Sequence, residues 1–258
     1  MGNALLTGWL NNAVSIQQIT VIEPNNDAVK NVPKSNKVSF VTEASEIIDN
    51  NKPKIIVFAT KPQIMDIVTQ QFMQFSAAEN MFISIVAGKT IKYFEKQCGK
   101  IPIVRAMPNT PASIRLGITV ACANKYINKK QKDICDILLK AVGSVAWIED
   151  ENLLDPITAI SGGGPAYVFL LTECLTSAGI QAGLPDRLAH RLARETISGA
   201  GAMLQNTNED AETLRMRVTS PGGTTAEAIR VLTTNNVWQN LVTKAIKAAA
   251  LRSQELAD

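Results

Sequence analysis

The chain has 258 residues, of which 46% are hydrophobic and 19% are charged, and its formal net charge is +3. This length allows one large domain or two ordinary ones, and the hydrophobic content is that of a globular protein. So small a positive charge argues against a nucleic-acid or acidic-membrane partner. No apolar run reaches about eighteen residues and no secretory signal is visible, so we expect no membrane span and a cytoplasmic protein.

The cysteines and the single histidine exclude the common metal-binding patterns. Cysteines occur at positions 98, 122, 135 and 174, without a Cys-x-x-Cys pair, and His190 stands alone within a helical pattern. Zinc sites need several such ligands at close spacing. We therefore expect no metal, and we interpret the cysteines as buried small side chains of a reducing compartment.

Short runs rich in valine and isoleucine alternate with helical patterns through the first half of the chain. The runs predict strands at residues 19–22, 38–41, 55–59, 82–86, 101–106, 118–121 and 145–148. The helical patterns cover residues 44–50, 63–75 and 91–98. Because the strands show little polar alternation, we expect a parallel sheet covered on both faces. Residues 1–150 are thus predicted to form a doubly wound α/β, Rossmann-like domain.

The pattern changes near Asp150, after which no strand is indicated. Helical periodicity covers residues 165–182, 185–204, 211–218, 226–232 and 237–251. Residues 151–258 are therefore predicted to form an all-helical domain. Its run of small residues at 198–202 fits close packing of helices, either within one chain or against a second subunit.

Two strand ends in the first half carry candidate ligand contacts, because doubly wound sheets bind ligands beyond the carboxyl ends of their strands. Lys61 follows the strand at 55–59 and either meets a phosphate or ribose or is a surface lysine before a helix. Val86 and Ala87 end the next strand, where small side chains let a flat ring approach the backbone. The proline-bounded loop at 105–111 either turns polar side chains inward or is a rigid connector.

Two glycine-rich segments lie in the second half. Residues 161–167 read Ser-Gly-Gly-Gly-Pro-Ala-Tyr and lack a P-loop lysine, which indicates close approach to a ligand or to a neighbouring helix. Residues 220–225 read Ser-Pro-Gly-Gly-Thr-Thr, which suits either a carboxylate site at a helix start or a turn with a threonine cap. Because no nucleophile–base pair is visible, the chemistry of an enzyme built on this chain must come from a cofactor.

Four segments in order, residues 57–63, 104–111, 155–167 and 220–225, resemble the pyrroline-5-carboxylate reductases, and the resemblance covers almost the whole chain. It implies a Rossmann domain that binds NADPH or NADH and a helical domain that interlocks with a second subunit in a homodimer or larger homo-oligomer. It also implies hydride transfer to a cyclic imine, 1-pyrroline-5-carboxylate, which yields L-proline.

The resemblance assigns roles to individual residues. Thr225 matches the catalytic threonine whose hydroxyl meets the imine nitrogen. Ser220, Gly223 and Thr224 match the cradle of the substrate carboxylate, and Glu151 and Arg217 match positions that line the pocket. The expected cofactor-binding residues are Gly2, Glu23, Ala59, Thr60, Lys61, Pro62, Val86 and Ala87. An acidic residue at position 23 favours NADH, whereas the family more often uses NADPH, so the preference stays open.

The first residues depart from the family pattern. Residues 1–6 resemble the end of the family's glycine fingerprint, so the first strand and its first two glycines are expected to be missing. Either the start is mis-assigned, or the chain is a truncated, weakly active or inactive pseudo-enzyme. Gly163 also replaces a serine that is common in the family.

A third alternative is another imine or β-hydroxyacid dehydrogenase. Those enzymes typically place an acid–base lysine in the helical domain. No lysine lies between Lys140 and Lys244, which counts against this class.

Overall fold

The computed structural model describes residues 1–11, 18–30, 32, 35–47, 53–77 and 79–256, which divide into two compact units. Residues 1–162 and 249–258 form the first unit, and residues 163–248 form the second. The strands are β1 (Ile19–Ile22), β2 (Val38–Val41), β3 (Ile55–Phe58), β4 (Met81–Ser84), β5 (Ile103–Met107), β6 (Gly117–Ala123) and β7 (Gly143–Ile148). The helices are α1 (Gly2–Asn11), α2 (Asn26–Val29), α3 (Met65–Phe72), α4 (Ile91–Cys98), α5 (Lys129–Lys140), α6 (Leu154–Ile157), α7 (Gly164–Gln181), α8 (Asp186–Asn206), α9 (Ala211–Arg217), α10 (Thr224–Thr233) and α11 (Val237–Glu255).

The main sheet of the first unit has the order β3-β4-β5-β6-β7. β3, β4 and β5 are parallel to one another, β6 is antiparallel to β5, and β7 is parallel to β6. The α/β class is confirmed, but the expectation of a wholly parallel sheet is wrong at β6. Residues 108–116 connect β5 to β6, which is too short for the crossover that a parallel pair needs.

β1 and β2 form a separate two-stranded parallel sheet, in which Ile19 lies opposite Val38. Among the described residues, none pairs β1 with β3. Ahead of β1, residues 2–11 form α1.

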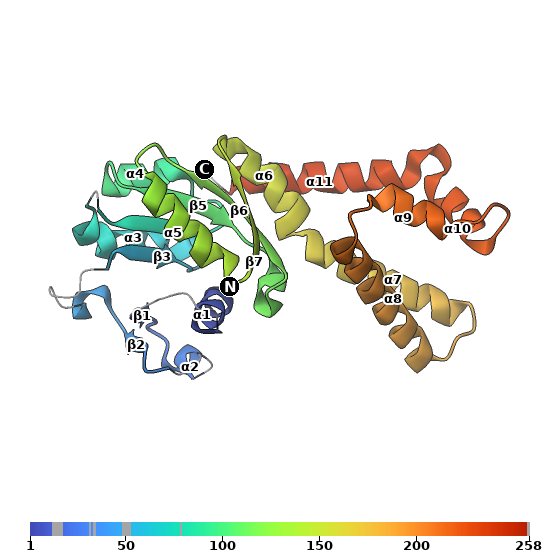
Figure 1. Ribbon diagram of the computed structural model, residues 1–258, viewed down its shortest axis with the longest axis horizontal. Coiled ribbons are helices and arrows are strands. Elements are labelled where there is room, and N and C mark those ends of the chain that lie inside the picture. The colour runs from blue at the N-terminus through green and yellow to red at the C-terminus, as the bar shows by residue number, and fades with distance from the viewer. Residues whose placement is uncertain (12–17, 31, 33–34, 48–52, 78, 257–258) are drawn as a thin grey trace. The chain divides into compact units, whose positions relative to one another are not determined.

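Helices cover both faces of the main sheet (Figure 1). On one face, α3 and α4 bury a phenylalanine cluster, in which the Phe58 ring lies 5.2–5.5 Å from the rings of Phe72, Phe82 and Phe94. On the other face, Cys135, Leu138 and Leu139 of α5 pack on the sheet, with Trp9 of α1 beside them. Each fully buried leucine or phenylalanine side chain stabilises the fold by about 1.5–3 kcal/mol.

The helix predictions of the first half have different outcomes. The helix predicted at 91–98 is confirmed as α4, and the Thr90 hydroxyl accepts a hydrogen bond from the Tyr93 amide at its start. The pattern at 63–75 becomes a 3₁₀ turn, then α3, then a second 3₁₀ turn. The helix predicted at 44–50 is a single 3₁₀ turn at Ala44–Glu46, and residues 48–50 lie outside the described residues.

The second unit, described at every residue, contains only helices, as predicted. α7 and α8 pack closely at Gly179, where an added Cβ would lie 3.4 Å from the Ala189 Cβ atom. Only Thr176, Ala189 and Ala193 are buried in this unit, whereas Phe169 is 62% exposed. A unit with so small a core cannot stand alone on its own packing. The boundary proposed at residue 150 stays a prediction.

Candidate functional site

The start of α1 lies at the carboxyl end of β3. A Cβ added to Gly2 would come within 3.3 Å of the Ala59 Cβ atom, so only a glycine leaves this space open. Leu5 is buried in a cluster that includes Val57 and Ile85, which fixes the helix against the ends of β3 and β4. A ten-residue helix that starts at this edge presents its amides and the positive end of its dipole there. The residues present thus fit the phosphates of a dinucleotide.

Other expected cofactor residues follow the strand ends. After β3, Ala59 and Lys61 are exposed, the Thr60 hydroxyl donates to Met65 Sδ at 2.9 Å, and Pro62 begins a 3₁₀ turn. Glu23 follows β1 in the smaller sheet, and its Oε1 accepts from the Asn25 amide at 3.0 Å. The structure therefore brings Gly2 and Ala59 together, and it places Glu23 at the end of the other sheet.

The loop between β4 and α4, residues 85–90, is held at several points. The Ile85 amide donates to the Phe58 carbonyl at 3.0 Å, and the Val86 amide donates to Ser84 Oγ at 3.3 Å. Gly88 has φ +77°, and a Cβ there would lie 2.4 Å from the Leu256 carbonyl oxygen. Glycine is thus required at this position, both for the backbone conformation and for the close approach. Val86 is buried and Ala87 is exposed, so the loop offers its backbone to a ligand at residue 87.

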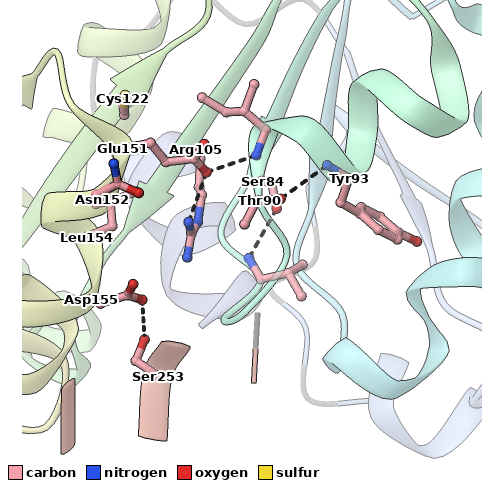
Figure 2. A network of polar contacts seen from close by, with 12 residues as sticks. Ser84, Thr90, Tyr93, Arg105, Cys122, Glu151, Asn152, Leu154, Asp155 and Ser253 are labelled. Atoms are coloured by element: carbon pink, nitrogen blue, oxygen red, sulfur yellow. Dashed lines mark hydrogen bonds and ion pairs between the residues drawn. The ribbon is translucent and has the colours of Figure 1, made fainter. Parts of the chain in front are cut away.

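An ion pair between buried Arg105 and Glu151, whose side chain is 25% exposed, lies beside the end of this loop (Figure 2). The Arg105 side chain is 4% exposed, and its Nη1 donates to Glu151 Oε1 at 2.9 Å. The same oxygen accepts from the Ile91 amide, the first of α4, at 2.8 Å. No described group accepts from Nε or Nη2 of Arg105. Burial, and then the charge of Glu151, raises the pKa of the Cys122 thiol, which lies opposite Arg105 on β6.

Sequence reasoning missed this pair. Arg105 stands in the apolar run of β5, and a buried arginine requires an anionic partner, which was the available signal. That signal does not say which carboxylate is used, because Glu151 is 46 residues away in the sequence.

Residues 220–225 form a turn followed directly by a helix. The Gly223 amide donates to the Ser220 carbonyl at 3.0 Å, with Pro221 second and Gly222 third at φ +70°. This is the arrangement of a type II turn. Gly223 then precedes α10, and no described side chain caps that helix. The first amides of α10 and the exposed hydroxyls of Thr224 and Thr225 can therefore bind a small carboxylate and a polar neighbour.

The two charged residues expected in the substrate pocket both have internal partners. Arg217, at the end of α9, forms an ion pair with Glu209. Glu151 is paired with Arg105, as described above. Each side chain is thus neutralised within its own unit.

Other motifs of the sequence have local structural roles. The Asn109 side chain accepts from the Ile118 amide at 2.9 Å, which supports the rigid-connector interpretation of that loop. In the segment 161–167, a π-helical turn at Thr158–Gly162 precedes α7, with Pro165 in its first turn. Within the described ranges, no group of three His, Cys, Asp or Glu side chains is placed to hold a metal ion. None of the described helices combines the length and hydrophobicity of a transmembrane span.

An α/β unit with a helix start and open loops at its strand ends has the parts of a nicotinamide-dependent oxidoreductase. The helical unit adds an uncapped helix start beside hydroxyl groups, which is suited to a small acid.

Comparison with known proteins then gives the family. Residues 151–256 match the family described as pyrroline-5-carboxylate reductase dimerisation. The pyrroline-5-carboxylate reductase of Pseudomonas aeruginosa is 36% identical over 259 residues, covering 100% of this chain and 94% of that protein. A Coxiella burnetii structure of the same name has 35% identity and a TM-score of 0.91, covering 100% of this chain and 95% of that one. A Plasmodium falciparum pyrroline carboxylate reductase with NADP bound has 30% identity and a TM-score of 0.82, with coverages of 100% and 95%. The chain belongs to the pyrroline-5-carboxylate reductase family.

Proposed function

We propose that this chain reduces 1-pyrroline-5-carboxylate to L-proline with a hydride from NADPH or NADH. The observation that carries the proposal is the turn at residues 220–223, which leads into the uncapped start of α10. Relatives that share the full length of the chain and bear the name of this activity support it.

The substrate side of the reaction rests on the second unit. The amides of Thr224 and Thr225 would bind the substrate carboxylate, with Ser220 and Gly223 shaping the turn. The Thr225 hydroxyl would hydrogen-bond the imine nitrogen. A protonated imine is already electrophilic, so the chain needs to orient it rather than attack it. Glu151 and Arg217 would line the pocket as side chains that are already neutralised.

The cofactor side rests on the first unit. The start of α1 at Gly2 would bind the pyrophosphate, residues 59–62 would contact the nucleotide, and Val86 with Ala87 would contact the nicotinamide. Glu23 would accept hydrogen bonds from a ribose. When bound, the nucleotide supplies the hydride to the imine carbon, and the imine nitrogen keeps the proton that it acquires.

Self-association completes the proposal. The exposed apolar side chains of the second unit would be covered in a homodimer, as the match to a dimerisation family supports.

Steady-state reduction of pyrroline-5-carboxylate with each nucleotide tests the proposal. We expect oxidation of the nucleotide that depends on the imino acid, and formation of L-proline. Absence of turnover with both nucleotides, in a protein that binds them, contradicts it.

A further inference from the structure

We propose that Arg105 and Glu151 are positioning residues for the nicotinamide, because they hold the loop at residues 85–90 where it enters α4. This inference rests on the proposed function, in which Val86 and Ala87 contact the nicotinamide. The family resemblance places Glu151 in the substrate pocket, and holding the loop at residues 85–90 is a separate role.

The first step is the placement of Arg105 beside the loop. Arg105 on β5 lies opposite Ser84 on β4 in the parallel register. Ser84 Oγ accepts from the Val86 amide at 3.3 Å, so the loop leaves the sheet at the position of this pair. Figure 2 shows one Glu151 oxygen joined by dashed lines both to Arg105 and to the start of α4.

The second step is the bond from Glu151 to the far end of the loop. Glu151 Oε1 accepts from both Arg105 Nη1 and the Ile91 amide. The Ile91 amide belongs to the first helical turn and has no partner within the helix, and a carboxylate there also meets the positive end of the helix dipole. Thr90 caps the same turn through the Tyr93 amide at 3.1 Å. The end of the loop is thus held by one oxygen that Arg105 orients.

The third step is that the rest of the loop at residues 85–90 is also held by backbone contacts. At its start the loop is bonded to the Phe58 carbonyl, and at Gly88 it lies against the Leu256 backbone. These contacts at both ends of the loop would fix the backbone of residues 86 and 87 before a ligand binds. Such preorganisation lowers the cost of binding and of reaching a reactive geometry.

Desolvation offsets much of the attraction within a buried ion pair, so replacing both side chains by apolar ones of similar size often leaves the free energy of unfolding unchanged or higher. A test of positioning should therefore remove the hydrogen bond to Ile91 while changing stability little. Glu151→Gln keeps an oxygen for the Ile91 amide, whereas Glu151→Met has a similar size and no strong acceptor. Because Glu151→Met leaves Arg105 buried and unpaired, the double variant Arg105→Met with Glu151→Met removes that charge as well.

The experiment is titration of NADPH and NADH into each variant without substrate, followed by nucleotide fluorescence. We expect the Kd of Glu151→Gln to stay within about threefold of the wild-type value. We expect the Kd to rise about tenfold in Glu151→Met and in the double variant. The KM for pyrroline-5-carboxylate at saturating nucleotide should change less than the nucleotide Kd.

Leu139→Ala, in the α5 core on the other face of the sheet, controls for loss of stability alone. It should lower Tm without raising the nucleotide Kd. A double variant that binds nucleotide like the wild type overturns the proposal. So does a rise in the imino-acid KM with an unchanged nucleotide Kd, which would leave Glu151 with a role in the substrate pocket alone. A wild-type chain that binds neither nucleotide overturns the proposed function, and this inference with it.

Discussion

At the residue scale, the proposed function assigns the imine contact to the hydroxyl of Thr225, which is exposed at the uncapped start of α10. Thr225→Ala removes one hydrogen bond with a net value of about 0.5–1.5 kcal/mol, so we expect kcat to fall roughly 2- to 10-fold. The nucleotide Kd, measured by fluorescence titration, should not change. Thr225→Ser keeps the hydroxyl and should retain most of the activity. Unchanged kinetics in the alanine variant would remove Thr225 from the site.

Glu23 supports a second prediction at this scale, on the choice between nucleotides. A carboxylate near the adenosine ribose repels a 2′-phosphate. The repulsion energy of two unit negative charges about 4 Å apart is about 1 kcal/mol even in water. Glu23→Gln should therefore raise the ratio of kcat/KM for NADPH over NADH about fivefold or more. Asp27→Asn makes the same change in charge on exposed α2 and is the control. Equal ratios in the two variants would place Glu23 away from the ribose.

At the scale of elements, α3 and α4 are joined by the Tyr93 hydroxyl, which donates to Asp66 Oδ1 at 2.7 Å. Burial, and then the bond to Asp66, raises the pKa of Tyr93 to about 12. In return, the bond from Tyr93, and then the charge of Lys89, lowers the pKa of Asp66 below its ordinary value. A lowered carboxyl pKa stabilises the fold above the unfolded value of about 3.9, and this stabilisation is lost as the pH falls toward the folded value.

Tyr93→Phe removes the main cause of that shift. We expect the drop in the urea midpoint between about pH 6 and pH 3 to be smaller in this variant than in the wild type. Asp66→Asn should reduce the drop in the same way, and the double variant should add nothing further. An undiminished acid dependence in both single variants would show that the bond does not bridge the two helices in solution.

Elements with local signals were predictable, and those that depend on distant partners were not. Thr90 and the amphipathic pattern mark α4 from neighbouring residues alone, and the prediction matches its bounds. β6 is antiparallel to β5 because the connection between them, residues 108–116, is short. The alternation of strand residues does not indicate the direction of a strand. The pairing of Arg105 with Glu151 joins β5 to the segment after β7, and no local pattern encodes it.

At the scale of the whole molecule, the second unit has an apolar surface that its own core does not cover. Phe169 and Leu170 on α7 are exposed, as are Trp238 and Leu241 on α11. A monomer rarely exposes so many large apolar side chains, so this surface is expected to lie in a homodimer interface. In a two-fold interface each substitution acts twice, because both copies carry it.

Phe169→Asp therefore tests the assembly and the stability of the molecule together. Burial of one phenylalanine contributes about 1.5–3 kcal/mol, and a carboxylate at the same place adds a desolvation penalty. We expect the mass measured by sedimentation to fall from dimer to monomer, and Tm and turnover to fall with it. Glu173→Gln, one turn further along the exposed surface of α7, should leave all three unchanged. A variant that remains dimeric with an unchanged Tm would exclude Phe169 from the interface, and the same pair of measurements would then be repeated at Leu241 on α11.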